Sequence, residues 1–331
     1  MLDITLFSLI TLFITMDLFL LISTFIPGIE RKYIHARIQQ RVGPSVFSPG
    51  IMAPIKFLFK ENINPRSPVP GLYKALPIVC FIVILLVLLT TMPQLYTFAA
   101  FCSLLTVIGL LKIEEIAYVF MGALSKSVMS LGTPFPDIIK GAIHPDAERS
   151  YIEDLSSKRA FRLITYGSFP LYLGLFAPVV YAGSLFIGDI VSYQSANGPF
   201  LFTLAGMISA IVFFVGYMIL LNEYPFAIMK TKADVIEGPY MEYASVYRSF
   251  VFINRGFLMF TLGILFSVLF IGLPPYLWSW EILLNIAVAL IFPIIMGIFS
   301  TFSPIFTNRQ FYPTVIGVSL LGILSIILCL L

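Results

Sequence analysis

Long apolar runs alternate along this chain with stretches in which polar residues gather. Eight such runs cover about residues 4–27, 76–92, 95–111, 163–187, 200–221, 250–273, 282–302 and 311–331. Each approaches the roughly 20 residues that an α-helix needs to cross a bilayer, and none alternates as barrel strands do. The pattern predicts an all-α, polytopic membrane protein with eight transmembrane helices.

The composition points the same way. Hydrophobic residues make up 59% of the chain and charged residues only 11%, and the mean hydropathy is +0.97. A soluble domain carries about 25% charged residues. No internal repeat or second soluble domain is visible, so we expect one membrane domain over residues 1–331.

The basic residues give this domain an orientation. All 20 Lys and Arg lie in or at the edge of loops that follow odd-numbered runs, at 28–74, 112–162, 222–250 and 303–310. Loops rich in Lys and Arg stay in the cytoplasm. The distribution therefore predicts a cell-membrane protein with cytoplasmic loops at these positions and both termini outside the cytoplasm.

Two of these loops carry helical patterns of their own. Ile34, Ile38 and Val42 recur four residues apart, which predicts an amphipathic surface helix that ends before Pro44. Such a helix either rests on the membrane interface or docks a peripheral protein. In the second loop, the apolar stretch 116–124 is too short to span, which predicts a partly embedded or re-entrant helix.

No sequence motif indicates catalysis by this chain. A P-loop, a dinucleotide fingerprint, a nucleophile elbow and a zinc-protease motif are all absent from the sequence. Cys80, Cys102 and Cys329 each stand alone in an apolar run, so we interpret them as packing residues. We expect no catalytic residue, no metal ligand and no nucleic-acid partner.

The candidate chemistry lies in carboxylates near the membrane. Asp17 falls inside the first run, where a carboxylate either serves an ion relay or pairs with a hydroxyl such as that of Thr15. Glu30 adjoins Arg31 at the end of the same run, which favours an ion pair between them. Partner docking is expected at the first basic loop and at one tyrosine of the third, namely Glu30, Arg31, Lys32, Arg37, Arg41 and Tyr243.

Further carboxylates gather in the second and third loops. Neighbouring charges spread their proton affinities, and bridging waters let such groups pass protons. Ordinary solvated loop charge is the alternative interpretation. Together with Asp17, the residues predicted to couple or translocate ions are Glu114, Glu115, Glu223, Asp234, Glu237, Glu242, Lys230 and Lys232.

Three segments resemble one known family. They read E-R-K at 30–32 with R-V-G-P at 41–44, Y-V-F-M-G-A-L at 118–124, and P-F at 225–226 with G-P-Y-M-E-Y-A at 238–244. This pattern is similar to subunit 1 of the NADH dehydrogenase of respiratory complex I, a subunit type that also occurs in energy-converting [NiFe] hydrogenases. Ala227, Lys230 and Lys232 stand where the family usually has acids, which favours the hydrogenase branch of methanogenic archaea.

The resemblance implies a membrane anchor and ion-translocation subunit. Hydrogenase-like large and small subunits would dock on its cytoplasmic face, and antiporter-like subunits would lie beside it in the bilayer. Those partners would carry the Ni–Fe centre and iron–sulfur clusters, so this chain is expected to bind no cofactor itself. Two alternatives stay open: a quinone- or methanophenazine-site subunit of a complex I-like dehydrogenase, and a stand-alone secondary transporter.

Overall fold

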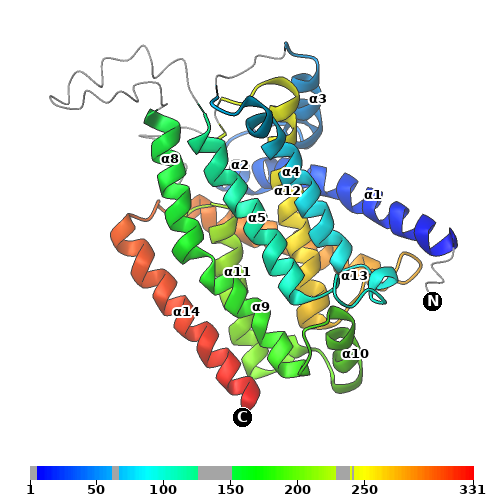
Figure 1. The fold of residues 1–331 in the computed structure, drawn as a ribbon. Helices are drawn as coiled ribbons and strands as arrows, with labels where there is room; N and C mark the ends of the chain where they lie inside the picture. The colour runs from blue at the N-terminus through cyan, green and yellow to red at the C-terminus, as the bar shows by residue number, and fades with distance from the viewer. Residues whose placement is uncertain (1–5, 62–66, 126–150, 229–238, 241) are drawn as a thin grey trace.

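The computed structural model describes residues 6–61, 67–125, 151–228, 239–240 and 242–331 (Figure 1). Within those residues the chain is helical, with a single isolated bridge between Ser103 and Phe186. The longer helices are α1 (Leu6–Ile29), α4 (Pro70–Thr90), α5 (Leu104–Ala123), α8 (Tyr151–Arg162), α9 (Phe169–Ala182), α10 (Ile187–Asn197), α11 (Leu204–Leu220), α12 (Ser245–Phe266), α13 (Glu281–Phe302) and α14 (Asn308–Leu330). The all-α prediction is confirmed for the described part of the chain.

Six helical segments are long and apolar enough to cross a membrane. They are Leu6–Ile38, Pro70–Thr90, Ser156–Ala182, Ser245–Ile271, Glu281–Phe302 and Arg309–Leu330. The other two predicted spans correspond to α11, which has 17 residues, and to α5, whose apolar sequence is broken by charged residues. The structure thus supports six of the eight predicted crossings by length and composition.

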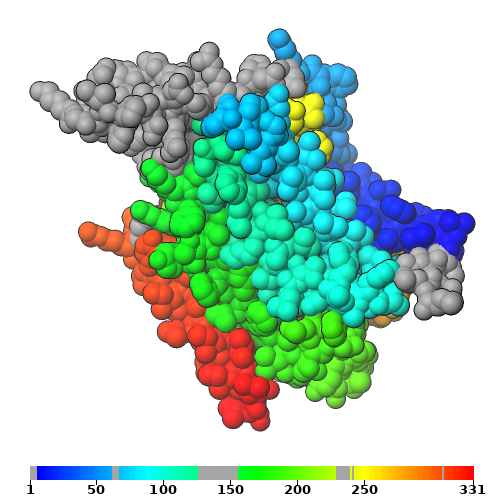
Figure 2. Space-filling model, viewed as in Figure 1, coloured from blue at the N-terminus to red at the C-terminus, as the bar shows by residue number. Residues whose placement is uncertain are grey.

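Helix α12 lies at the centre of the bundle. Within Ser245–Ile271, 83% of the spanning window is buried, far more than in any other span. Helices α1, α4 and α13 pack around α12, while α9, α11 and α14 form a second group beside it. The outermost helices are α1, which projects from the body in Figures 1 and 2, and α14. Helix α12 is therefore the most buried of the six candidate spans.

Small residues let the second group of helices pack closely. A Cβ at Gly216 of α11 would lie 2.4 Å from the backbone nitrogen of Leu171 on α9. No real Cβ tolerates a backbone atom so near, so glycine at this position sets the separation of α9 and α11. This packing fixes the end of α11, from which the chain enters the candidate site.

The first span is longer than expected. Helix α1 continues without a break through η1 (Glu30–His35) and α2 (Ala36–Ile38), and the chain leaves the helical conformation at Gln40, whose φ is 53°. The separate surface helix predicted over 34–42 is therefore wrong. Ile34 packs inward, against Gly297 of α13. As a result, η1 lies beside α13 rather than on the surface.

The third span is also displaced. The run predicted at 95–111 includes a loop, and α5 begins only at Leu104, where the Ser103 hydroxyl accepts from the Leu105 N–H at 3.3 Å. A separate re-entrant helix over 116–124, as predicted, is wrong, because those residues continue α5 to Ala123. Partial embedding of this segment stays a prediction. Glu114 and Glu115 lie within α5, and both are buried.

Candidate functional site

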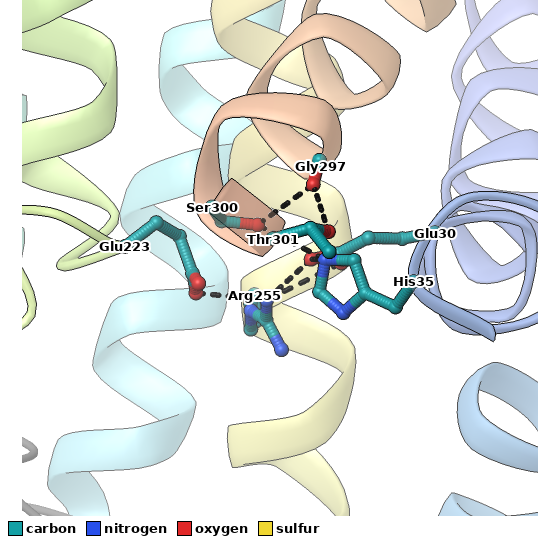
Figure 3. A network of polar contacts seen from close by, with 7 residues as sticks. All are labelled: Glu30, His35, Glu223, Arg255, Gly297, Ser300 and Thr301. Atoms are coloured by element: carbon teal, nitrogen blue, oxygen red, sulfur yellow. Dashed lines mark hydrogen bonds and ion pairs between the residues drawn. The ribbon is translucent and has the colours of Figure 1, made fainter. Parts of the chain in front are cut away.

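One arginine joins two carboxylates from separate parts of the chain (Figure 3). Arg255 lies on α12, Glu30 begins η1, and Glu223 follows α11. The Arg255 Nη2 donates to both Glu30 carboxylate oxygens, at 3.2 and 3.3 Å, and forms a 2.8 Å ion pair with Glu223 Oε1. We call Glu30, Arg255 and Glu223 the arginine bridge.

The arginine bridge is held in the interior. The side chains of Glu30 and Glu223 are 2% and 8% exposed, whereas that of Arg255 is 26% exposed. A buried charge is tolerated when it is paired, and removing one partner leaves the other uncompensated. A single guanidinium nitrogen of Arg255 contacts both acids. A change in the charge of one acid therefore changes the strength of the ion pair between Arg255 and the other acid.

A histidine extends the arginine bridge toward α13. The Nε2 of His35, on η1, lies 3.0 Å from the Ser300 hydroxyl oxygen and 3.6 Å from Glu30 Oε1. The Ser300 hydroxyl in turn donates to the Gly297 carbonyl at 3.0 Å. Figure 3 shows these groups converging where η1, α12 and α13 meet.

A second charged cluster lies on α5. The Lys112 Nζ donates to Glu115 Oε2 at 2.6 Å and to the Ile164 carbonyl at 3.2 Å, and the Ser168 hydroxyl donates to Glu115 Oε1 at 2.8 Å. Glu114, next to it, is 1% exposed, and the Tyr118 side chain lies beside its carboxylate. We call Lys112, Glu114 and Glu115 the α5 cluster.

Water-sized cavities adjoin both sites. A cavity of about 20 Å³ is lined by Glu114, Glu115 and Ser168, and by Ile219 and Leu220 at the end of α11. Another of about 50 Å³ lies beside Glu30, against α13. Each exceeds the 10–15 Å³ that one water needs. The α11 residues that line the first cavity, Ile219 and Leu220, precede Glu223 of the arginine bridge by four and three positions along the chain.

The structure rearranges some predicted pairings. Glu30 pairs with Arg255 rather than with its neighbour Arg31, so that prediction is wrong. Asp17 is exposed on the outer face of α1, about 20 Å along the helix from Glu30. Its predicted hydroxyl partner, Thr15, is buried and donates to the Thr11 carbonyl at 2.7 Å. Asp17 is therefore not brought together with the other candidate residues.

The predicted docking residues lie in two environments. Arg31, Arg37 and Arg41 are exposed, and Lys32 is half-buried. Tyr243 is buried, stacks on Tyr73 with ring centroids 4.4 Å apart, and donates to the Tyr73 carbonyl at 2.6 Å. Burial, followed by the effect of Tyr73, raises the pKa of Tyr243 above the usual phenol range. The side chain of Tyr243 thus anchors its loop against α4.

Part of the third-loop prediction falls beyond the described structure. Lys230, Lys232, Asp234 and Glu237 lie outside the described residues, and Glu242 is half-buried within them. Their roles stay predictions. Sequence reasoning also missed residues that complete the two sites, namely Arg255, His35, Ser300, Lys112 and Ser168. A charge within a predicted span was the available signal for Arg255, since such charges are paired.

Comparison with known proteins agrees with this fold. The sequence profile of a family described as NADH dehydrogenase matches residues 9–132 and 152–331. The chain belongs to this family. It is 43% identical over 311 residues to the uncharacterized protein MJ1362 of Methanocaldococcus jannaschii, covering 94% of both chains. An NADH-quinone oxidoreductase subunit of Orientia tsutsugamushi (strain Ikeda) is 27% identical over 265 residues, covering 78% of this chain and 70% of the relative.

A solved structure shares the architecture. The chain matches a subunit in the structure of the membrane-bound sulfane sulfur reductase, an archaeal respiratory membrane complex, with a TM-score of 0.73 and 24% identity. The match covers 96% of this chain and 99% of the other. The chain therefore has the fold of the complex I subunit 1 family, and the resemblance predicted from its loop motifs is confirmed.

Proposed function

We propose that this chain is the membrane anchor and ion-translocation coupling subunit of an energy-converting [NiFe]-hydrogenase-like complex. It would link ferredoxin and hydrogen redox chemistry in docked soluble subunits to proton or sodium movement in antiporter-like neighbours. Membership of the NADH dehydrogenase family supports a subunit of an oxidoreductase complex. A 43% identical chain occurs in Methanocaldococcus jannaschii. The choice of the hydrogenase branch rests on Ala227, Lys230 and Lys232, which stand where the family usually has acids.

The observation that carries the proposal is the arginine bridge. Glu30 and Glu223 share one nitrogen of Arg255, so neutralising either acid favours the ion pair with the other. A docked redox partner that displaces the loop after α11 would move Glu223 and release Arg255 toward Glu30. Interior charges interact more strongly than charges in water, so a small displacement produces a large change in proton affinity.

The α5 cluster provides a second site at which a carboxylate can hold a proton. Glu115 is compensated by the Lys112 cation and by Ser168, whereas Glu114 has only the neutral Tyr118 hydroxyl beside it. A charged carboxylate without a cation beside it is costly in the interior, so Glu114 is suited to carrying a proton. The adjoining cavity is large enough for one bridging water, which would link the α5 cluster to the end of α11.

The basic first loop is the proposed docking surface for the soluble partners. Arg31 and Arg37 are exposed on the helix that carries the buried Glu30, and Arg41 is exposed just beyond its end. A partner that contacts Arg31 or Arg37 would therefore be connected to the arginine bridge by a single continuous helix from α1 to α2. In this proposal the basic loops face the cytoplasm, both termini lie outside it, and α5 and α11 complete the eight crossings.

Copurification and a redox assay test the proposal. The chain is tagged in its native host, the complex is isolated in mild detergent, and hydrogen evolution from reduced ferredoxin is measured. We expect hydrogenase-like large and small subunits, antiporter-like subunits, and ferredoxin-dependent hydrogen evolution. Isolation of the chain alone, or transport by it without partners, would instead indicate a stand-alone transporter.

The quinone-site alternative makes a different prediction. Ligand pockets for drug-sized molecules enclose about 300–1,000 Å³, whereas the cavity beside Glu30 holds about 50 Å³. This size favours water over a quinone ring next to the arginine bridge. Electron transfer from the purified complex to a soluble quinone or phenazine analogue, blocked by substitutions lining this cavity, would favour the alternative.

A further inference from the structure

His35 stands between the arginine bridge and the edge of the molecule. Its side chain is 23% exposed, whereas the neighbouring Glu30 is 2% exposed. Nε2 points toward Ser300 and Glu30, and the other ring nitrogen points away from both (Figure 3). Imidazole is the side chain that exchanges protons near neutral pH, and its two nitrogens can act on opposite sides of the ring.

The hydrogen bonds around Ser300 suit a ring that carries its hydrogen on Nε2. The Ser300 hydroxyl has one proton, and in one arrangement it donates this proton to the Gly297 carbonyl at 3.0 Å. In that arrangement the Ser300 oxygen, 3.0 Å from His35 Nε2, accepts from Nε2–H. Nδ1 of the neutral ring holds a lone pair on the side away from the arginine bridge.

Ser300 also suits the ring after Nε2 has lost its proton. The hydroxyl can turn from the Gly297 carbonyl and donate to Nε2 at the same 3.0 Å separation. Thr301 Oγ1 donates to the same carbonyl at 2.7 Å, so Gly297 keeps a partner when Ser300 turns. The site therefore satisfies both tautomers of His35 without moving the backbone.

The charged residues around His35 come from three parts of the fold. Glu30, Arg31 and Lys32 share η1 with it, Arg255 approaches from α12, and Glu223 comes from the loop after α11. Helix α13 offers only hydroxyls here, because its single charged residue, Glu281, lies at the opposite end. The carboxylate nearest to Nε2 is that of Glu30, at 3.6 Å.

From this geometry we infer that His35 is a proton relay between water and Glu30, in a complex that translocates protons. A hydronium ion in the adjoining water gives a proton to Nδ1, so one O–H bond breaks, one N–H bond forms, and a water molecule is left behind. The imidazolium then gives its Nε2 proton to Glu30, which breaks one N–H bond and forms one O–H bond on the carboxylate. A single proton has moved inward. Reorientation of the ring then returns its remaining N–H toward Ser300.

The inference rests on the proposed function and deepens it. Protonation neutralises Glu30 and weakens its contacts with Arg255, which then pairs with Glu223 alone. Each proton delivered by His35 therefore shifts Arg255 from Glu30 toward Glu223. Ser300 acts as a positioning residue. Its hydroxyl contacts the His35 ring, whereas the proton is transferred to Glu30.

Substitution of His35 in the native complex tests the relay. The complex carrying His35→Gln, reconstituted in vesicles, is compared with the unsubstituted complex for proton uptake and for hydrogen evolution with a dye as electron donor. Glutamine keeps an N–H for Ser300 but cannot pass a proton. We expect proton uptake to fall about a hundredfold, the lower end of the range for loss of a positioned proton-transfer group, while the dye reaction continues.

A chemical rescue separates relay from simple packing. With His35→Ala, added imidazole is expected to restore proton uptake, and substituted imidazoles should shift its pH profile according to their own basicity. A purely structural histidine would show no such shift. Normal proton uptake by His35→Gln, or failure of every imidazole to restore His35→Ala, would overturn the relay.

Glu30→Gln distinguishes failure of the relay from failure of the proposed function. If Glu30→Gln abolishes coupled proton uptake and His35→Gln does not, the coupling function stands and the relay is wrong. If both variants translocate protons normally, the arginine bridge is not the coupling element. If sodium moves and proton uptake is absent in the unsubstituted complex, the relay is wrong as well.

Discussion

Replacing Arg255 by methionine tests the stabilising role of the arginine bridge. The substitution removes the cation that contacts Glu30 and Glu223, whose side chains are 2% and 8% exposed. Removing one partner of a buried ion pair costs about 3–5 kcal/mol. Because Arg255 is 26% exposed and His35 stays 3.6 Å from Glu30, we expect a cost of about 3 kcal/mol, near the lower end of that range.

The cysteines of the chain provide the assay. Cys80 and Cys102 are buried, so a thiol-reactive fluorophore labels them only as the protein unfolds. Cys329 is partly exposed and is replaced by alanine in every variant. At about 2 °C per kcal/mol for a chain of this size, Arg255→Met should melt about 6 °C lower in detergent.

Two comparisons make this prediction refutable. Lys56→Met, at an exposed position of α3 (Ala53–Leu58), removes a cation from the surface and should leave the melting temperature nearly unchanged. Adding Glu30→Gln and Glu223→Gln to Arg255→Met removes the unpaired acids and should recover part of the loss. If Arg255→Met melts like Lys56→Met, or if the triple variant is no more stable than Arg255→Met, the reasoning is refuted.

Three further predictions follow from other parts of the structure. Lys112→Met should destabilise the chain by about 1–3 kcal/mol, because Glu115 loses its 2.6 Å contact with the Lys112 ammonium. Adding Glu115→Gln to Lys112→Met should recover part of the lost stability, as measured by the thiol assay. Gly216→Val should lower the melting temperature, whereas Gly317→Val should not, since a Cβ at Gly317 meets nothing within 4 Å. Asp17→Asn should leave the ion-to-hydrogen ratio of the complex unchanged, because Asp17 lies on the outer face of α1; a lower ratio would contradict the placement.

The sequence predicts the spanning helices well where the apolar runs are uninterrupted. The run expected at 282–302 corresponds to α13, Glu281–Phe302, and the run at 311–331 to α14, Asn308–Leu330. Length and hydropathy determine these helices, because a lipid-facing helix is apolar on nearly every side. No contact with a distant residue is needed to recognise them.

The prediction is wrong where charged residues pair inside the molecule. Lys112, Glu114 and Glu115 follow directly on the third apolar run, so hydropathy alone ends the span before them, yet α5 continues past them to Ala123. Glu115 can be buried because Lys112 and Ser168 compensate it. Of these partners, Ser168 is 53 positions away, and no local pattern reveals the contact.

The candidate site is predicted only in part for the same reason. Glu30 and Glu223 are recognisable as carboxylates at membrane edges, but the residue that joins them is not. Arg255 lies 225 positions from Glu30, and their contact depends on α1 and α12 packing side by side. Local sequence therefore indicates which residues are candidates, while helix packing decides which of them meet.

The central claim is that the arginine bridge couples redox chemistry to ion movement. Its most direct test is the number of ions translocated per hydrogen evolved by the complex carrying Glu223→Gln, measured in sealed vesicles. Glutamine keeps the size of the side chain but removes the charge that competes for Arg255. We predict that the ratio falls toward zero while hydrogen evolution with a dye is retained. An unchanged ratio, or an equal loss of both activities, would contradict the claim.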